Sequence, residues 1–136
     1  MSAGQLGITG GLGKIDFGEA LARTAAALKT EGFGVITEID VQATMKQKLG
    51  VDVRPYRILG TCNPPIAHRA LEADPMIGLL LPCNVIVFED ERGDVTVSIA
   101  NPRKMFELVG APGVSEMVEV VYGKLESAAR SLKGNG

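Results

Sequence analysis

The chain has 136 residues, which is enough for one domain with its own hydrophobic core and too few for a second domain. Apolar residues make up 46% and charged residues 22% of the sequence, which excludes a disordered chain. The net charge of -2, the absence of a basic block and a content of four phenylalanines, two tyrosines and no tryptophan argue against nucleic-acid binding.

Capping residues, apolar periodicity and glycine or proline breaks predict strands and helices that alternate irregularly. The glycine-rich N-terminus lacks the spacing of a phosphate-binding loop, so we expect a flexible or bulged strand there. Asp40 is expected to cap a short helix whose Val41, Met45 and Leu49 point inward. A hairpin turn at residues 90–93 favours an α+β fold with a mostly antiparallel sheet. The predicted helices cover residues 17–30, 41–49, 64–73, 102–109 and 114–132, and the predicted strands cover residues 33–39, 55–61, 79–89 and 95–99.

The dipeptide Cys-Asn occurs twice, as Cys62-Asn63 and Cys83-Asn84, and the chain contains no other cysteine. Each pair follows an apolar segment, so both thiols are expected near strand ends. If the two strands are antiparallel, the chain leaves the sheet at Cys62 and returns at the same end, near Cys83. The N-terminus lacks the features of a signal peptide and no apolar run could span a membrane, which predicts a cytoplasmic protein with reduced thiols.

The four residues of the repeated dipeptide allow both functional and structural interpretations. Cys62 precedes a predicted helix N-terminus, where unpaired amides can stabilise a thiolate, but a small buried residue at a strand end fits equally well. Asn63 has a sufficient role as the N-cap of that helix. Asn84 follows Pro82 in a strand, where its carboxamide either satisfies freed backbone groups or recognises a ligand.

The only histidine, His68, lies six residues after Cys62 and is expected to face solvent. A zinc site made of Cys62, Cys83 and His68 would need a fourth ligand, such as Glu38 or water. No CxxC or paired-histidine spacing supports such a site, and no acid is placed to orient a Cys-His nucleophilic pair. We therefore predict no metal or cofactor and favour a function that is not enzymatic.

Several segments, taken in their order along the chain, resemble the domain-of-unknown-function family 302. The resemblance covers roughly residues 16–105 and implies a TATA-binding-protein-like α+β fold, in the order β-α-β(4)-α, with helices on one face of the sheet. The whole chain, 1–136, would then be one domain closed by an amphipathic helix at about 114–132, and homodimers would be expected. The family brings no established reaction. The segments that carry the resemblance are Gly32-Phe33-Gly34-Val35, Glu38-Ile39-Asp40, Lys48-Leu49-Gly50, Tyr56 to Pro64, Ala67, Ala70-Leu71 and Leu79 to Val85.

The leading functional hypothesis is a homodimeric binding domain for an unidentified small ligand, with no nucleic-acid or membrane partner. Its pocket would be built around the two Cys-Asn pairs, with His68 and Glu38 as further candidates. One alternative is a thiol-based redox or sulfur-transfer protein that uses Cys62, and another is that the motif is purely architectural. Residues 85–88 are apolar on both faces of their strand, so the side without helices should meet the N-terminal segment, a long loop or a second subunit.

Overall fold

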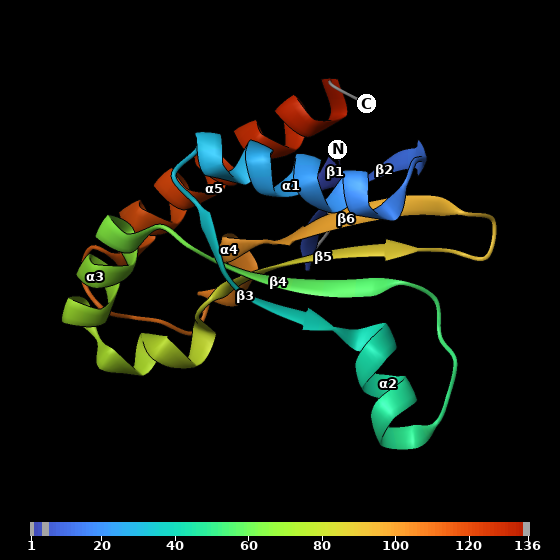
Figure 1. Cartoon of the computed structure of the whole chain (residues 1–136). Coiled ribbons are helices and arrows are strands. Elements are labelled where there is room, and N and C mark those ends of the chain that lie inside the picture. The colour runs from blue at the N-terminus through green and yellow to red at the C-terminus, as the bar shows by residue number, and fades with distance from the viewer. Residues whose placement is uncertain (1, 4–5, 135–136) are drawn as a thin grey trace.

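The computed structural model describes residues 2–3 and 6–134, which form one antiparallel sheet with helices on one side (Figure 1). The strand order in the sheet is β1-β2-β6-β5-β4-β3, and every neighbouring pair is antiparallel. The strands are β1 (Ser2–Ala3), β2 (Gly7–Lys14), β3 (Gly34–Asp40), β4 (Tyr56–Cys62), β5 (Cys83–Glu89) and β6 (Asp94–Ala100). The helices are α1 (Phe17–Thr30), α2 (Val41–Leu49), α3 (Pro64–Ala73), the 3-10 helix η1 (Pro75–Leu80), α4 (Pro102–Met105) and α5 (Val114–Gly134).

The succession of β2, α1, the four strands β3 to β6 and α5 confirms the α+β class and the order expected from the sequence. The predicted strand at 79–89 is shorter than expected, because Pro75 opens the 3-10 helix η1 and the strand begins only after Pro82. The predicted helix at 102–109 ends at Met105. Beyond it, Phe106 and Val109 pack against a small apolar cluster instead of continuing the helix.

Short polar side chains begin the helices as their sequence positions predict. Asp16 accepts a hydrogen bond from the Glu19 amide at 3.0 Å and starts α1, and Asp40 does the same for α2 through the Ala43 amide at 2.9 Å. Asn101 accepts from the Arg103 amide at 3.0 Å at the start of α4. These bonds satisfy amides that have no partner within the first helical turn.

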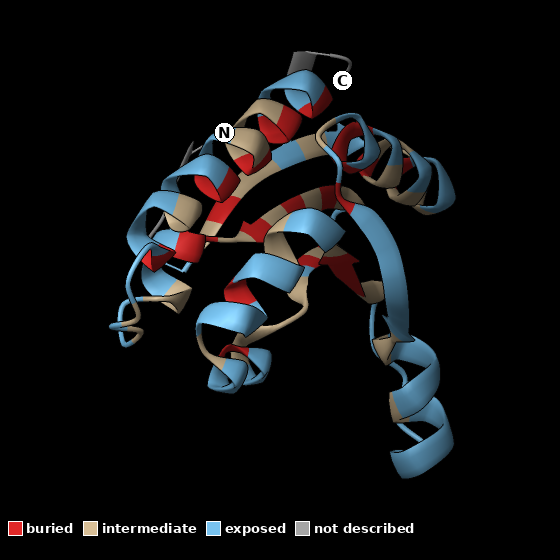
Figure 2. Cartoon of the chain, turned by 90° about the vertical axis from the view of Figure 1, so that its left-hand side faces the viewer, coloured by how far each residue is buried: buried red, intermediate tan, exposed pale blue. Residues whose placement is uncertain are grey.

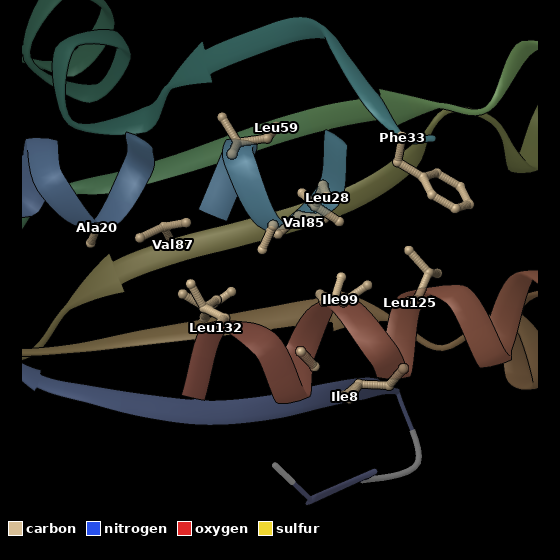
Figure 3. Close-up of a cluster of buried hydrophobic side chains, with 14 of the residues drawn as sticks. Ile8, Ala20, Leu28, Phe33, Leu59, Val85, Val87, Ile99, Leu125 and Leu132 are labelled. Atoms are coloured by element: carbon tan, nitrogen blue, oxygen red, sulfur yellow. The ribbon is translucent and has the colours of Figure 1, made fainter. Parts of the chain in front are cut away.

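The main core lies between the sheet and helices α1 and α5, which run side by side over one face (Figures 1 and 3). Strand alternation directs Val85, Val87, Val97 and Ile99 into this layer, where each is at most 1% exposed. Leu125 of α5 is fully buried among them. A second cluster, centred on Ala70, Ile77 and Val114, joins α3, η1 and the start of α5.

Helix α2 projects from the sheet as an exposed arm (Figure 2). None of its residues is fully buried. Val41 and Met45 are half-buried and are the only residues of α2 that are not exposed, whereas Leu49 is 71% exposed, so the expectation of an inward side chain is wrong for Leu49. The reason is tertiary: α2 follows the edge strand β3, and beyond that edge no described element covers Leu49. Strand β3 itself is exposed from Gly34 to Ile39.

On the opposite side of the sheet, the described helices form no layer (Figure 1). The apolar side chains of β3, β4 and β5 on this side are here called the uncovered face. By strand register Ile39 lies opposite Ile58, Ile58 lies opposite Ile86, and Tyr56 lies opposite Phe88. The Tyr56 and Phe88 rings stack with centroids 5.6 Å apart. Among the described residues, no helix has both the length and the hydropathy needed to cross a membrane.

Candidate functional site

Strands β4 and β5 bring the two cysteines to the same end of the sheet. Thr61 lies opposite Cys83 in the antiparallel register, so Cys62 is one residue beyond the pair, where the chain leaves the sheet toward α3. The Thr61 hydroxyl donates a hydrogen bond to the Cys83 carbonyl at 2.8 Å. The convergence of the two thiols, which the sequence predicts for antiparallel strands, is therefore present in the structure.

Beside the cysteines lies a cavity of about 340 Å³ between this end of the sheet and helices α3, α4 and α5. Thr61, Cys62 and Cys83 form its wall on the sheet side. The remaining wall is apolar: α3 supplies residues such as Ile66 and Ala67, and the start of α5 supplies a run of valines and one methionine. The cavity has the size and the apolar lining that are typical of small-molecule sites.

Asn63 joins the cavity wall to the helix start. Its carboxamide oxygen accepts a hydrogen bond from the Ile66 amide at 3.4 Å, which is the N-cap role predicted from the sequence. Its carboxamide nitrogen faces Gly32, where an added Cβ would lie 2.9 Å from it. Gly32 also has a φ of +87°, which favours glycine, and a larger residue there would displace the Asn63 carboxamide. Asn63 thus lines the cavity at the start of α3, where its hydrogen bond to Ile66 orients the side chain.

The other three candidate residues lie outside this cavity. Asn84 is exposed and lines a separate hollow of about 110 Å³, which shares Pro82 and Cys83 with the main cavity. The His68 side chain is 76% exposed, and its Nδ1 lies 3.6 Å from a Glu72 carboxylate oxygen. Glu38 forms an ion pair with Arg57.

The zinc site considered from the sequence is not assembled in this structure. The described residues contain no group of three histidine, cysteine, aspartate or glutamate side chains that could hold a metal ion. His68 is turned to solvent one helical turn from Glu72, and it does not line the cavity with Cys62 and Cys83. The site thus consists of two thiols, one hydroxyl and one carboxamide in an apolar wall.

Burial raises the pKa of the Cys83 thiol and so favours its neutral form. Desolvation, with a smaller contribution from neighbouring Cys62, raises the pKa of the Cys83 thiol to about 11. The thiolate is the nucleophilic form of cysteine, and at neutral pH Cys83 is a protonated thiol. In chemical terms Cys83 is therefore a weakly polar wall residue.

Much of the cavity wall was not identified from the sequence. Phe106, Met117 and Val118 line it, whereas the sequence indicates only that the final helix is amphipathic and closes the domain. The available signal was the Gly-Ala-Pro-Gly break at residues 110–113, which separates the final helix from the segment before it. That break lets the segment and the helix form two walls of one cavity.

The fold and site define a small α+β domain with helices on one face of an antiparallel sheet and an apolar cavity at the sheet end. The sequence matches the family described as Domain of unknown function DUF302 over residues 12–132, so the chain belongs to that family. The structure is similar to the crystal structure of uncharacterized conserved protein DUF302 from Bacillus stearothermophilus, with a TM-score of 0.81 and 26% identity, covering 92% of this chain and 96% of that chain. Comparison with curated proteins gives no match.

Proposed function

We propose that this chain is a homodimeric, non-catalytic binding domain whose site is the cavity beside Cys62, Asn63 and Cys83. The observation that carries the proposal is the cavity itself, which has a volume of about 340 Å³. It lies where β4 ends at Cys62 and β5 begins at Cys83. Natural ligand sites occupy about 300–1,000 Å³ and combine an apolar wall with a few polar groups. The described residues of the cavity wall are mainly apolar, with a few polar groups among them, and this composition supports a binding site.

A thiol-based redox or sulfur-transfer function is the second candidate, and the electrostatics disfavour it for one of the two thiols. Such chemistry needs a thiolate, whereas burial raises the pKa of Cys83 to about 11. Cys62 directly precedes the N-cap of α3, so it is the thiol on which this alternative depends. In the described part of the cavity wall the two thiols are the only ionisable side chains, so no histidine or carboxylate lies there to accept the proton of Cys62.

Filling the cavity is expected to abolish ligand binding. In Ala67→Phe, a phenyl ring added to the cavity wall takes up the space that a ligand needs. The matched control is Ala26→Phe, which places the same ring on an exposed position of α1 outside the cavity. The probes are N-phenyl-1-naphthylamine and its sulfonated counterpart 8-anilino-1-naphthalenesulfonate, titrated by fluorescence.

At least one of these two dyes should bind one molecule per chain to the wild type and to Ala26→Phe, and binding to Ala67→Phe should be at least tenfold weaker. Circular dichroism checks that both variants remain folded. If neither dye saturates on the wild type, or if both variants bind alike, the cavity is not a binding site and the proposed function is wrong.

Exposed apolar surface supports the homodimer. The uncovered face contains Ile39, which is 50% exposed. The adjoining arm ends at Leu49, which is 71% exposed, and Val51 in the loop after it is 45% exposed. A patch of this kind on an edge strand and one sheet face is costly in water and can pair with a second copy through a two-fold axis. A stable interface buries about 800 Å² per subunit.

Sedimentation at micromolar concentration is expected to give about twice the 14.3 kDa mass of one chain. The Ile39→Glu variant should sediment as a folded monomer, because a carboxylate in the interface would lose its hydration. Val120→Glu is the matched control, since Val120 is 49% exposed on α5. If only Val120→Glu dissociates the dimer, the interface lies on α5 and not on the uncovered face. A wild-type protein that sediments as a monomer would contradict the homodimer.

A further inference from the structure

The chemistry of the cavity wall restricts the ligand further, and this step rests on the proposed binding function. Among the described residues, no aspartate, glutamate, lysine, arginine or histidine lines the cavity. The wall consists of hydrocarbon and thioether side chains, apart from Thr61, Cys62, Asn63 and Cys83. We propose that the ligand is an uncharged, largely hydrocarbon molecule, either an aliphatic chain or an aromatic ring system.

The few polar groups of the cavity wall already form hydrogen bonds within the protein in part. The Thr61 hydroxyl donates to the Cys83 carbonyl at 2.8 Å, and the Asn63 carboxamide oxygen accepts from the Ile66 amide. This leaves two thiols, which are weak hydrogen-bonding groups, the carboxamide nitrogen of Asn63 and the Thr61 hydroxyl oxygen as an acceptor. A sugar, nucleotide or peptide would leave many of its polar groups without partners in such a wall, at a large cost in affinity.

A charged head group would also find little compensation inside the cavity. Cys83 stays a neutral thiol at physiological pH, because burial raises its pKa to about 11. Two basic side chains that follow wall residues in sequence already have partners. His68 lies beside Glu72, and Arg103 makes two hydrogen bonds to the Glu119 carboxylate, at 2.8 and 3.1 Å. The Arg103 guanidinium also stacks on Tyr122, with its Cζ 3.6 Å from the ring centroid.

The volume and the adaptability of the wall fit a ligand of moderate size. A cavity of about 150 Å³ with an aliphatic and aromatic lining suffices to bind benzene in another protein, and the present cavity is about 340 Å³. Met117 lies in the wall, and an unbranched thioether can adapt to ligands of different shape. Phe106 contributes an aromatic face on which a flat ligand can pack.

The test compares ligands of one shape that differ only in charge, with the wild-type protein. N-Phenyl-1-naphthylamine is neutral, and 8-anilino-1-naphthalenesulfonate adds one negative charge to the same ring system. The neutral dye is expected to bind at least tenfold more tightly. In a second series, 1-decanol should displace the neutral dye at concentrations at least tenfold lower than decanoate or decylammonium, all used below their micelle concentrations.

The outcomes separate the ligand class from the function. If the sulfonated dye and decanoate bind as tightly as their neutral counterparts, the inferred class is wrong and the binding function stands. Arg69, which is exposed on α3 next to Ala70 of the cavity wall, would then be the first residue to test as the anion's partner. If neither dye binds, or if the Ala67→Phe variant still binds the neutral dye as the wild type does, the cavity is not the site and both proposals fail.

Discussion

Leu125→Ala is expected to lower the free energy of unfolding by about 2–5 kcal/mol, the range for a truncated core leucine. Leu125 is fully buried on α5, where it packs against the sheet within the main core (Figure 3). The mutation removes apolar contacts and leaves a cavity that close-packed neighbours fill only in part. Urea unfolding at one fixed protein concentration measures the loss, since the apparent stability of a dimer depends on concentration.

Leu108→Ala is the matched control, because the same atoms are removed from a side chain that is 99% exposed. Its effect on the free energy of unfolding should stay within about 0.5 kcal/mol. An equal loss in the two variants would contradict the described packing of α5. If Leu125→Ala does not fold, the milder Val121→Ala variant on the same helix gives a smaller loss in the same direction, since Val121 is 8% exposed.

The packing of α5 and of the strands was predictable from the sequence because their patterns are governed by local rules. The stripe of apolar residues on the final helix recurs at helical spacing, and Leu125 and Leu132 of that stripe are buried. Apolar residues alternate with polar ones along β6, and the apolar residues Val95, Val97 and Ile99 are all buried. In α5 and β6, the apolar face that the sequence pattern predicts packs against another element of the main core.

The apolar side of α2 has no such partner, and that is why the same reasoning failed there. Val41, Met45 and Leu49 recur at helical spacing, yet α2 buries none of its residues. Periodicity indicates that a face is suited to burial, but it does not say which element covers it. For α2, no element among the described residues covers Leu49 at the end of the helix.

For the candidate site, the sequence predicted that both cysteines lie at one end of the sheet. It did not predict that the side chain of Asn84 points away from the cavity. Cys83 shares its face of β5 with the buried Val85, whereas Asn84 is turned to the opposite face by strand alternation. His68 lies on the exposed side of α3. The cavity itself was not predictable, because an empty space results from the packing of elements distant in sequence.

Alkylation of Cys83 in the folded protein is expected to be slow at neutral pH. With a pKa of about 11 against the ordinary value of 9.0, its thiolate fraction near pH 8 is lower by about a hundredfold, and the rate follows that fraction. The Cys62→Ser variant leaves Cys83 as the only thiol. Burial, the larger cause of the shift, remains in this variant, so the midpoint of its rate against pH should stay above 9.0.

The reference for this experiment is the same variant unfolded in guanidinium, in which iodoacetamide should react with a midpoint near the ordinary cysteine pKa of 9.0. Equal midpoints in the folded and unfolded states would show that Cys83 is not desolvated, and would remove an argument against thiol chemistry at this site.

The raised pKa of Cys83 also predicts how stability depends on pH. Folding favours the neutral thiol, so its contribution to stability is complete below pH 9.0, where the thiol is protonated in both states. As the pH rises toward 11, the unfolded chain loses the proton first, and the folded state is destabilised relative to it. The difference in unfolding free energy between wild type and Cys83→Ala should therefore shrink between pH 9 and 11, because alanine has no proton to lose. A difference that stays constant over this range would contradict burial of the thiol beside the cavity.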